Sequence, residues 1–352
     1  MNAIEALARP EIVSLHAYSH AAWLPQLIRL HANEAPWRPS GDASCAGLNR
    51  YPEPQPAELA ARLAQLYGVS DDRLLVARGS DEAIDLLSRI FLRAGRDAIL
   101  QCTPTFGMYQ VAARIQGADV LDVPLERAHQ WRLDPDRVVA AWRPNIKLVY
   151  LCSPNNPTGN LLSADAIHAI CSKLDGKAVI VIDEAYIECA GVASFAAHLG
   201  SYATLVILRT LSKAHALAGA RCGALLGRPE LIDLARRIIP PYAIPQLTVE
   251  AVLRALEPGA LAVSRARLAE LLAERGHFAQ GLAQSLGIRQ VWPSDTNFLM
   301  IDCVDPQRIV EKAVAGGFIV RDLSGNPALP DSLRITVGTH AHNERLLQSL
   351  EA

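Results

Sequence analysis

The sequence lacks long apolar runs and any large excess of charge of one sign. Its 352 residues include 34 Lys or Arg and 36 Asp or Glu, which leaves a formal net charge of -2. A chain this close to neutral offers neither the basic patch that nucleic acid requires nor an acidic tail. No segment approaches the roughly 18 apolar residues that a membrane helix needs. We therefore expect no nucleic-acid partner and no membrane partner.

The seven cysteines never stand in the Cys-x-x-Cys spacing of metal or redox sites. The first ten residues include Glu5 and Arg9 and lack the apolar core of a signal peptide. These absences predict reduced thiols in a cytoplasmic protein, and we expect no metal site. Half of the residues are hydrophobic, which is enough for a large core, and the length predicts about two domains.

Composition divides the chain into three segments. Residues 1–44 are predicted to form an arm, because aromatic residues such as Trp23 and Trp37 are scattered among prolines without a regular period. Residues 45–245 predict a large α/β domain, which ends in a proline-rich stretch at 240–245. Residues 246–352 predict a smaller domain. It begins with a long helical pattern, broken near residues 258–259, and continues with strands at 297–301 and 333–337.

Short apolar runs alternate with helical patterns through the large domain, which indicates an α/β layer with a mostly parallel sheet. In such sheets the ligand binds beyond the carboxyl ends of the strands. The expected strands cover residues 74–77, 98–102, 120–123, 148–152, 178–182, 205–208 and 224–226. Residues that follow five of these strands should therefore face one crevice: Ser80, Asp81, Phe106, Asn156, Asp183, Tyr186 and Lys213.

Lys213 is the residue around which we interpret this crevice. A lysine so close to a buried strand serves either an ion pair or a Schiff base. Gly79 leads from a strand directly into a helix, whose first N–H groups form a ready anion site. Together with the strand-end Asp183 and with Arg221, these features fit one cofactor, pyridoxal 5′-phosphate, which needs an amine, a carboxylate at its ring nitrogen and a phosphate cradle.

Seven motifs resemble those of the fold type I aminotransferases, class II, and within them the histidinol-phosphate aminotransferases. The similarity runs over nearly the whole chain. The motifs are Asn-Arg-Tyr-Pro at 49–52, Arg-Gly-Ser-Asp-Glu at 78–82, Ser-Pro-Asn-Asn-Pro-Thr-Gly at 153–159, Asp-Glu-Ala-Tyr at 183–186, Thr-Leu-Ser-Lys-Ala at 210–214, Arg-Cys-Gly at 221–223 and Leu-Arg-Ile-Thr-Val-Gly-Thr at 333–339.

The resemblance implies a mostly parallel seven-stranded sheet, a smaller α/β domain and a role for each site residue. Lys213 would form the imine and transfer the proton, and Asp183 would pair with the pyridine nitrogen. Tyr186 and Asn156 would hold the ring oxygen, and Phe106 would stack on the ring where the family often has Tyr. His215 also departs from the family, where a larger aromatic is common. The implied phosphate contacts are Ser80, Asp81, Thr210, Ser212 and Arg221.

The implied reaction transfers an amino group between histidinol phosphate and 2-oxoglutarate in histidine biosynthesis. The implied substrate contacts are Tyr18, Asn156, Arg321 and Arg334, although Arg321 could instead pair with Asp322. Tyr51 would reach the cofactor of a partner subunit, so the resemblance implies a homodimer whose arm packs on the small domain and on the partner.

Three alternatives remain open within this resemblance. The first is an aromatic aminotransferase acting on phenylalanine or tyrosine, and the second is a threonine-phosphate decarboxylase of the same fold. The third is a regulator that only senses the cofactor. Such regulators have a DNA-binding domain in front, whereas residues 1–44 show no helix-turn-helix pattern.

Overall fold

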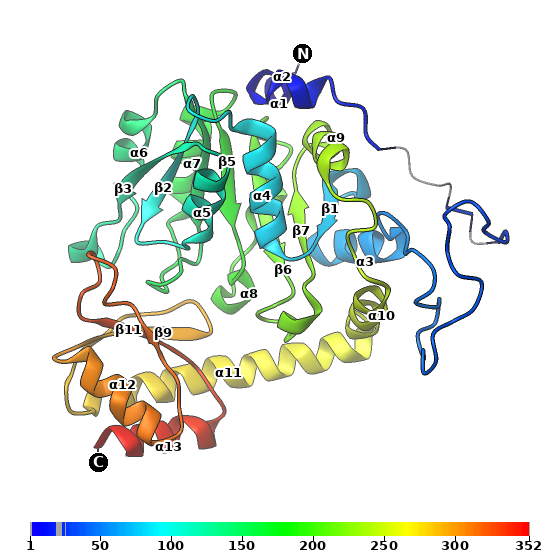
Figure 1. The fold of residues 1–352 in the computed structure, drawn as a ribbon. Coiled ribbons are helices and arrows are strands. Elements are labelled where there is room, and N and C mark those ends of the chain that lie inside the picture. The colour runs from blue at the N-terminus through cyan, green and yellow to red at the C-terminus, as the bar shows by residue number, and fades with distance from the viewer. Residues whose placement is uncertain (1, 19–22, 25, 352) are drawn as a thin grey trace.

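The structure is a computed structural model that describes residues 2–18, 23–24 and 26–351. A large α/β part stands above a smaller one, and an N-terminal segment extends along one side (Figure 1). In the part of the chain that the structure describes, no helix is both long and apolar enough to cross a membrane.

The large domain is built on a sheet that, within the described ranges, has seven strands in the order β1-β7-β6-β5-β4-β2-β3. The pairs from β6 to β3 are parallel, whereas β7 runs antiparallel to both β1 and β6. The expected mostly parallel sheet is therefore confirmed. Its strands are β1 (Leu74–Ala77), β2 (Ala98–Thr103), β3 (Asp119–Pro124), β4 (Ile146–Cys152), β5 (Val179–Asp183), β6 (Leu205–Thr210) and β7 (Gly223–Leu226).

Helices cover both faces of this sheet because its strands are apolar on both sides. In β5, Ile180 and Ile182 enter one buried cluster, while Val179 and Val181 enter the other. The first cluster includes α3 (Ala57–Tyr67), α6 (Pro135–Ala141) and α7 (Ala164–Leu174). The second includes α4 (Ser80–Phe91), α5 (Met108–Ile115) and α9 (Pro229–Ile238). Short connections contain α8 (Ile187–Ala190), η1 (Asp71–Arg73), η2 (Arg127–His129), η3 (Phe195–His198) and η4 (Ala218–Ala220).

The beginning of the arm packs on the large domain. It forms α1 (Ala3–Leu7) and α2 (Pro10–Val13), and Ile4 and Leu7 are buried in the same cluster as α4 and α9. The Arg9 N–H also donates to the Ile90 carbonyl over 2.9 Å. Residues 3–13 thus pack on the large domain, and the expected packing of the arm on the small domain stays a prediction.

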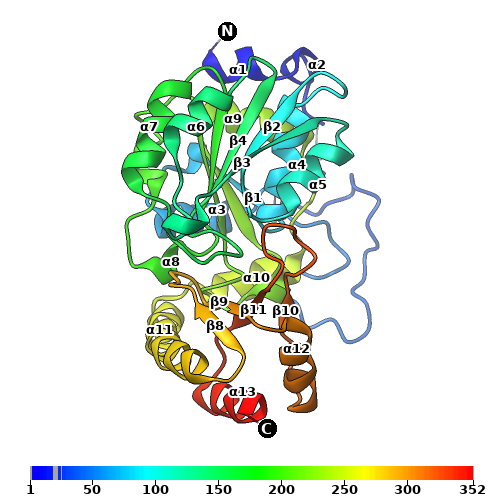
Figure 2. The same ribbon diagram turned by 90° about the vertical axis from the view of Figure 1, so that its left-hand side faces the viewer.

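The small domain carries an antiparallel sheet in the order β10-β11-β9-β8. Its strands are β8 (Ile288–Val291), β9 (Phe298–Cys303), β10 (Arg321–Asp322) and β11 (Ser332–Thr336). Figure 2 shows this sheet between the large domain and the helices α11 (Pro258–Gln284), α12 (Pro306–Ala315) and α13 (His340–Glu351).

Alternate residues of β9 and β11 serve two different surfaces. Leu299, Ile301, Leu333 and Ile335 join the core formed with α11, α12 and α13. The intervening residues form what we call the inner face of the small sheet, which lies toward the large domain. Its members are Phe298, Met300, Asp302, Ser332 and Arg334.

The helix after the proline-rich stretch, α10 (Gln246–Ala255), packs with the large domain. Val249 and Val252 are buried in the same cluster as Leu59 and Leu63 of α3. The expected break near residues 258–259 is confirmed, because α10 ends at Ala255 and α11 begins at Pro258. The division of the domains at residue 245 stays a prediction.

Candidate active site

A cavity of about 780 Å³ lies at the carboxyl ends of the parallel strands, where the two domains meet. It is lined by residues from the β1–α4, β2–α5, β4–α7, β5–α8 and β6–β7 connections, as the strand pattern predicts. The small domain adds β10, β11 and the segment between them. Of the expected site residues, those that line it are Ser80, Asp81, Phe106, Asn156, Asp183, Tyr186, Thr210, Ser212, Lys213, Arg221, Arg321 and Arg334.

Two expected residues, Tyr51 and Tyr18, do not line this cavity among the residues described. Tyr51 is 50% exposed, and its ring stacks on that of Tyr242 with 4.7 Å between the ring centres. Tyr18 is 67% exposed. Both lie in or near the arm, so the cavity of a single chain is formed without them.

Asp183 is a buried carboxylate at the end of β5, with only 2% of the residue exposed. It accepts hydrogen bonds from the Tyr109 hydroxyl over 2.8 Å and from the Ala185 N–H over 3.1 Å. Burial raises the pKa of Asp183 to about 6, although both hydrogen bonds work in the opposite direction. In the described residues, no Lys, Arg or His lies within ion-pair distance of this carboxylate. A cationic group placed beside Asp183 would therefore be strongly favoured.

Tyr109 is a site residue that sequence reasoning missed. It lies on the buried side of α5, and its ring stacks on Tyr150 with 4.4 Å between the ring centres. The Phe106 ring packs against it edge-on at 5.7 Å. One signal was available, since a tyrosine on an apolar helix face needs a partner for its hydroxyl. The partner, Asp183, lies 74 positions away and could not be identified from the sequence.

Lys213 extends into the cavity, with its Nζ 5.6 Å from the centre of the Tyr186 ring. Desolvation by the surrounding protein, together with Arg334, lowers the pKa of this amine. Within the described ranges, no carboxylate lies within ion-pair distance of Nζ. This geometry favours covalent chemistry over an ion pair, because a lysine with a lowered pKa is a better nucleophile and base.

The start of α4 has the features of an anion cradle. Gly79 leads into the helix with a left-handed φ of 82°, and none of the described side chains caps the first turn. Its N–H groups therefore stay available to a ligand. Arg221 lies directly beside this turn, because a Cβ atom on Gly79 would come within 3.0 Å of the Arg221 Nη2 atom. Thr210 donates a hydrogen bond to the Ser212 hydroxyl over 3.0 Å, so two hydroxyl groups complete the cradle.

Gly223 keeps the cradle close to the sheet. A Cβ atom at this position of β7 would lie 2.6 Å from the Arg209 carbonyl oxygen and 2.9 Å from the Gly79 carbonyl carbon. Only glycine permits so close an approach of the two backbones.

Arg321 and Arg334 stand directly opposite each other on β10 and β11. Like charges in this arrangement repel, and among the described residues neither guanidinium has a carboxylate within ion-pair distance. The Asp322 carboxylate instead accepts the Ser324 N–H over 2.8 Å. Arg334 donates to the Asn156 side-chain oxygen, and burial together with Arg321 lowers its pKa. Two cations facing one cavity in this way can bind a multiply charged anion.

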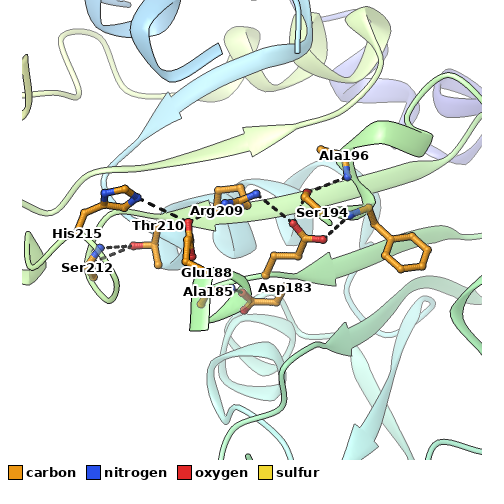
Figure 3. Close-up of polar contacts among 11 residues, drawn as sticks. Asp183, Ala185, Glu188, Ser194, Ala196, Arg209, Thr210, Ser212 and His215 are labelled. Carbon is orange, nitrogen blue, oxygen red and sulfur yellow. Dashed lines mark hydrogen bonds and ion pairs between the residues drawn. The ribbon is translucent and has the colours of Figure 1, made fainter. Parts of the chain in front are cut away.

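A buried ion-pair network connects the segment after Asp183 with the segment around Lys213 (Figure 3). Arg209 of β6 pairs with Glu188 over 2.7 Å and with Glu184 over 3.3 Å. Burial favours a raised pKa for Glu188, but His215 and Arg209 together hold that pKa below its ordinary value. The His215 Nε2 atom lies 3.7 Å from the Glu188 carboxylate, so this departure from the family supplies a polar partner within the network. The network thus joins the two loops that carry Asp183 and Lys213.

Comparison with known proteins agrees with this geometry. Residues 19–350 match the family described as aminotransferase class I and II. The chain is 45% identical over 349 residues to a histidinol-phosphate aminotransferase of Xanthomonas euvesicatoria pv. vesicatoria (strain 85-10), covering 98% of this chain and 96% of that protein. It is 44% identical over 351 residues to a histidinol-phosphate aminotransferase of Stenotrophomonas maltophilia (strain R551-3), covering 99% and 96%.

The fold is similar to the crystal structure of the histidinol-phosphate aminotransferase from Sinorhizobium meliloti in complex with pyridoxal-5′-phosphate. The TM-score is 0.79 at 26% identity, over 86% of this chain and 82% of that chain. Together with the match to the family over almost the whole sequence, this similarity explains why one cavity contains nearly all of the expected residues. The chain therefore belongs to the aminotransferase class I and II family of pyridoxal-phosphate-dependent enzymes.

Proposed function

We propose that this aminotransferase converts histidinol phosphate and 2-oxoglutarate into imidazole acetol phosphate and glutamate, and that it does so as a cytoplasmic homodimer. The observation that carries the proposal is the facing pair Arg321 and Arg334, which has no carboxylate partner among the described residues. Histidinol phosphate has no carboxylate, so its phosphate must occupy the place where most aminotransferases bind one. Two guanidinium groups suit a phosphate dianion, because each can donate a fork of hydrogen bonds. The names of the two relatives support the same substrate.

The described residues fit pyridoxal phosphate by their own geometry. Among the residues that the structure describes, Asp183 is a buried carboxylate without a cation at ion-pair distance, Lys213 is an amine without an ion-pair partner, and the start of α4 is uncapped beside Arg221. These groups complement a ring nitrogen, an aldehyde and a phosphate in turn. When bound, the cofactor supplies an electron sink that eases removal of a proton from the substrate carbon.

The chain's own residues bind and orient the substrate and move the proton. Lys213 Nζ would take the proton from the substrate carbon and would pass it on to the cofactor carbon, acting first as base and then as acid. Its lowered pKa increases the share of free amine that can act as a base. Asp183 would hold a proton on the ring nitrogen of the bound cofactor, and Tyr186 and Asn156 would hold and orient its ring oxygen.

A substrate panel tests the proposal. We expect kcat/KM for histidinol phosphate to exceed that for phenylalanine and tyrosine by orders of magnitude, because the aromatic amino acids bring one carboxylate charge to a pocket with two arginines. An equal or higher value for phenylalanine or tyrosine would favour the aromatic aminotransferase. Release of carbon dioxide from phosphothreonine would favour the decarboxylase.

The two arginines should differ in their effect on substrate binding. Arg334→Ala and Arg321→Ala should each raise KM for histidinol phosphate, because losing a charged partner costs roughly 2–5 kcal/mol where the remaining charge is buried. The larger effect should come from Arg334, which is the less exposed of the two. The absorbance of the resting enzyme should not change. Arg321→Lys is the control that keeps the charge but loses the fork. Unaltered kinetics in Arg321→Ala would mean that Arg321 does not bind the substrate and has a structural role.

Tyr109→Phe should isolate the hydrogen bond that Asp183 accepts from α5. That bond lowers the pKa of Asp183, so its loss should raise this pKa further, and kcat should fall about tenfold as a bond to a charged group is lost. The acid side of the pH profile for kcat should move to higher pH. Tyr150→Phe, in the stacked ring that does not bond Asp183, is the matched control. Equal profiles for the two variants would refute a role for the Tyr109 hydroxyl.

The proposed homodimer gives Tyr51 its place in the site. Its backbone is held by Glu34, whose carboxylate accepts the Tyr51 N–H over 2.7 Å and also pairs with Arg29 and Arg50. The ring itself remains half exposed and outside the cavity of its own chain. A fixed backbone and an exposed ring suit a residue that completes the site of a second copy.

Subunit mixing tests this arrangement. Lys213→Ala and Tyr51→Asp chains should each be inactive alone and should regain activity together, because a hybrid dimer holds one intact site. Random exchange makes half of the dimers hybrid, so about a quarter of the wild-type activity should return. Exchange is verified separately by mass spectrometry of differently tagged chains. Exchange without recovery would mean that no site is shared.

A further inference from the structure

Arg127 connects the large domain to three separate parts of the small domain. It lies in η2, and its Nη2 atom pairs with the Asp302 carboxylate of β9 over 2.8 Å. Its Nη1 atom donates to the Ala328 carbonyl over 3.2 Å. The guanidinium also lies beside two neighbouring rings, 5.3 Å from the centre of Trp131 and 5.6 Å from that of Trp292. Among the described residues, the Arg127–Asp302 pair is the only ion pair that joins residues 45–256 to residues 257–351.

The Asp302 carboxylate is built into the small sheet. It is 5% exposed and accepts two further hydrogen bonds, from Trp292 Nε1 over 2.9 Å and from the Ser332 hydroxyl over 2.6 Å. Ser332 faces Asp302 across the strands, and Arg334 follows two residues later on the same inner face. Through Asp302 and Ser332, Arg127 therefore helps to fix the position of the strand that carries Arg334.

The carbonyl of Ala328 places Arg127 behind the wall of the cavity. Leu323, Asn326 and Leu329, from the segment between β10 and β11, line the cavity, whereas Arg127 does not. The Asn326 side chain accepts the Ala328 N–H over 3.0 Å, and the Asn326 carbonyl accepts the Leu329 N–H over 2.8 Å. A contact at Ala328 thus fixes a turn whose other members touch the substrate space.

The loop that presents Arg127 adopts a backbone that is unfavourable for its residues. Gln130 and Trp131 both have left-handed φ values, 56° and 61°. Non-glycine residues keep such angles only where their surroundings enforce them, and such strain gathers at functional sites. Here the Asn160 side chain bonds the Trp131 carbonyl over 3.1 Å, which ties this loop to the loop that contains Asn156.

We infer that Arg127 is a positioning residue for substrate recognition, which holds β11 and the 323–329 segment at the distance where Arg334 and Arg321 can bind the anionic end of the substrate. This inference rests on the proposed function, because that function assigns the two arginines to the substrate. Arg127 acts through Asp302 and Ala328 and does not itself touch the substrate.

Arg127→Met tests the inference, with Arg132→Met as the matched control. Arg132 lies in the same loop but pairs with Glu126 of the large domain. In Arg127→Met, KM for histidinol phosphate should rise about tenfold, as for loss of a partly buried charge-assisted pair, and kcat should change less than threefold. The resting absorbance and the cofactor dissociation constant should match those of the wild type. Arg127→Lys should recover part of the loss, and Asp302→Asn added to Arg127→Met should add little, because both remove the same contact.

Amide hydrogen exchange provides a readout that does not depend on turnover. Residues 323–332 should exchange faster in Arg127→Met than in Arg132→Met, in the protein with and without cofactor. Unchanged exchange there, or a fall in kcat and cofactor affinity as large as the rise in KM, would overturn the positioning role. A wild-type enzyme that does not turn over histidinol phosphate would instead refute the proposed function, while the exchange experiment would still decide whether Arg127 fixes the segment.

Discussion

Lys213→Ala should abolish turnover and remove the visible absorbance that depends on the covalent link between cofactor and protein. The amine lies in the cavity beside the Tyr186 ring with a lowered pKa, and alanine can neither form the link nor carry the proton. The cofactor should still bind, because the α4 N-terminus, the hydroxyls of Thr210 and Ser212 and the Arg221 guanidinium remain. We expect a loss of at least about a thousandfold in kcat.

Borohydride reduction followed by peptide mass spectrometry measures the link directly. In the wild type the reduced cofactor should appear on the peptide that contains Lys213, and in Lys213→Ala on none. Lys177→Ala serves as the control, because that lysine is exposed and its Nζ donates to the Lys173 carbonyl, away from the cavity. Transamination by Lys213→Ala at near the wild-type rate would show that another residue performs the chemistry.

Asp183→Asn should lower kcat by orders of magnitude, because it removes the charge that holds a proton on the cofactor ring while keeping the shape of the side chain. Asp85→Asn, a carboxylate on α4 outside the cavity, should leave kcat unchanged. Asp183→Glu keeps the charge and should retain more activity than the asparagine variant. An unchanged kcat in Asp183→Asn would mean that a residue other than Asp183 pairs with the ring nitrogen of the cofactor.

The same substitution should stabilise the protein when the cofactor is absent. Burial raises the pKa of Asp183 in the folded protein from its ordinary value of 3.8 to about 6. At a pH below both values, the carboxyl is protonated in the folded and in the unfolded protein. As the pH rises from about 4 to about 6, the unfolded protein loses this proton first, so the contribution of the carboxyl to stability falls. Above that range the buried charge costs about 3 kcal/mol. Urea unfolding of cofactor-free protein should therefore show Asp183→Asn as the more stable form at pH 8, with the advantage gone near pH 4. A less stable variant at pH 8 would contradict this account.

The sequence was sufficient to predict the sheet and most of the cavity, because both depend on local patterns. Apolar runs mark β5 and β6, and the residues that follow them reach one edge of the sheet whatever the details of the loops. The direction of β7 was not predictable in this way. It runs antiparallel to β6 because the 211–222 connection returns the chain to the end of β6, where Gly223 pairs with Thr210, and Arg221 in that connection adopts a left-handed φ of 52°.

Contacts between distant segments account for what the sequence could not supply. Tyr109 matters because its hydroxyl donates to Asp183, and Arg127 matters because it pairs with Asp302, which lies 175 positions later. Neither residue stands in a motif that defines its partner. The first helices were missed for a different reason, since α1 and α2 are too short for a periodic pattern and are held by contacts with the large domain.

The alternation along β9 and β11 also constrains how this protein can diverge during evolution. Each strand serves the small-domain core with one set of residues and the inner face with the other, so a single inserted residue would exchange the two sets. Length changes are therefore selected against in these strands. The segment between β10 and β11 has no such register to keep, yet Leu323, Asn326 and Leu329 line the cavity. Descendants of this chain can thus acquire new substrate preferences by remodelling that segment while the catalytic domain remains unaltered.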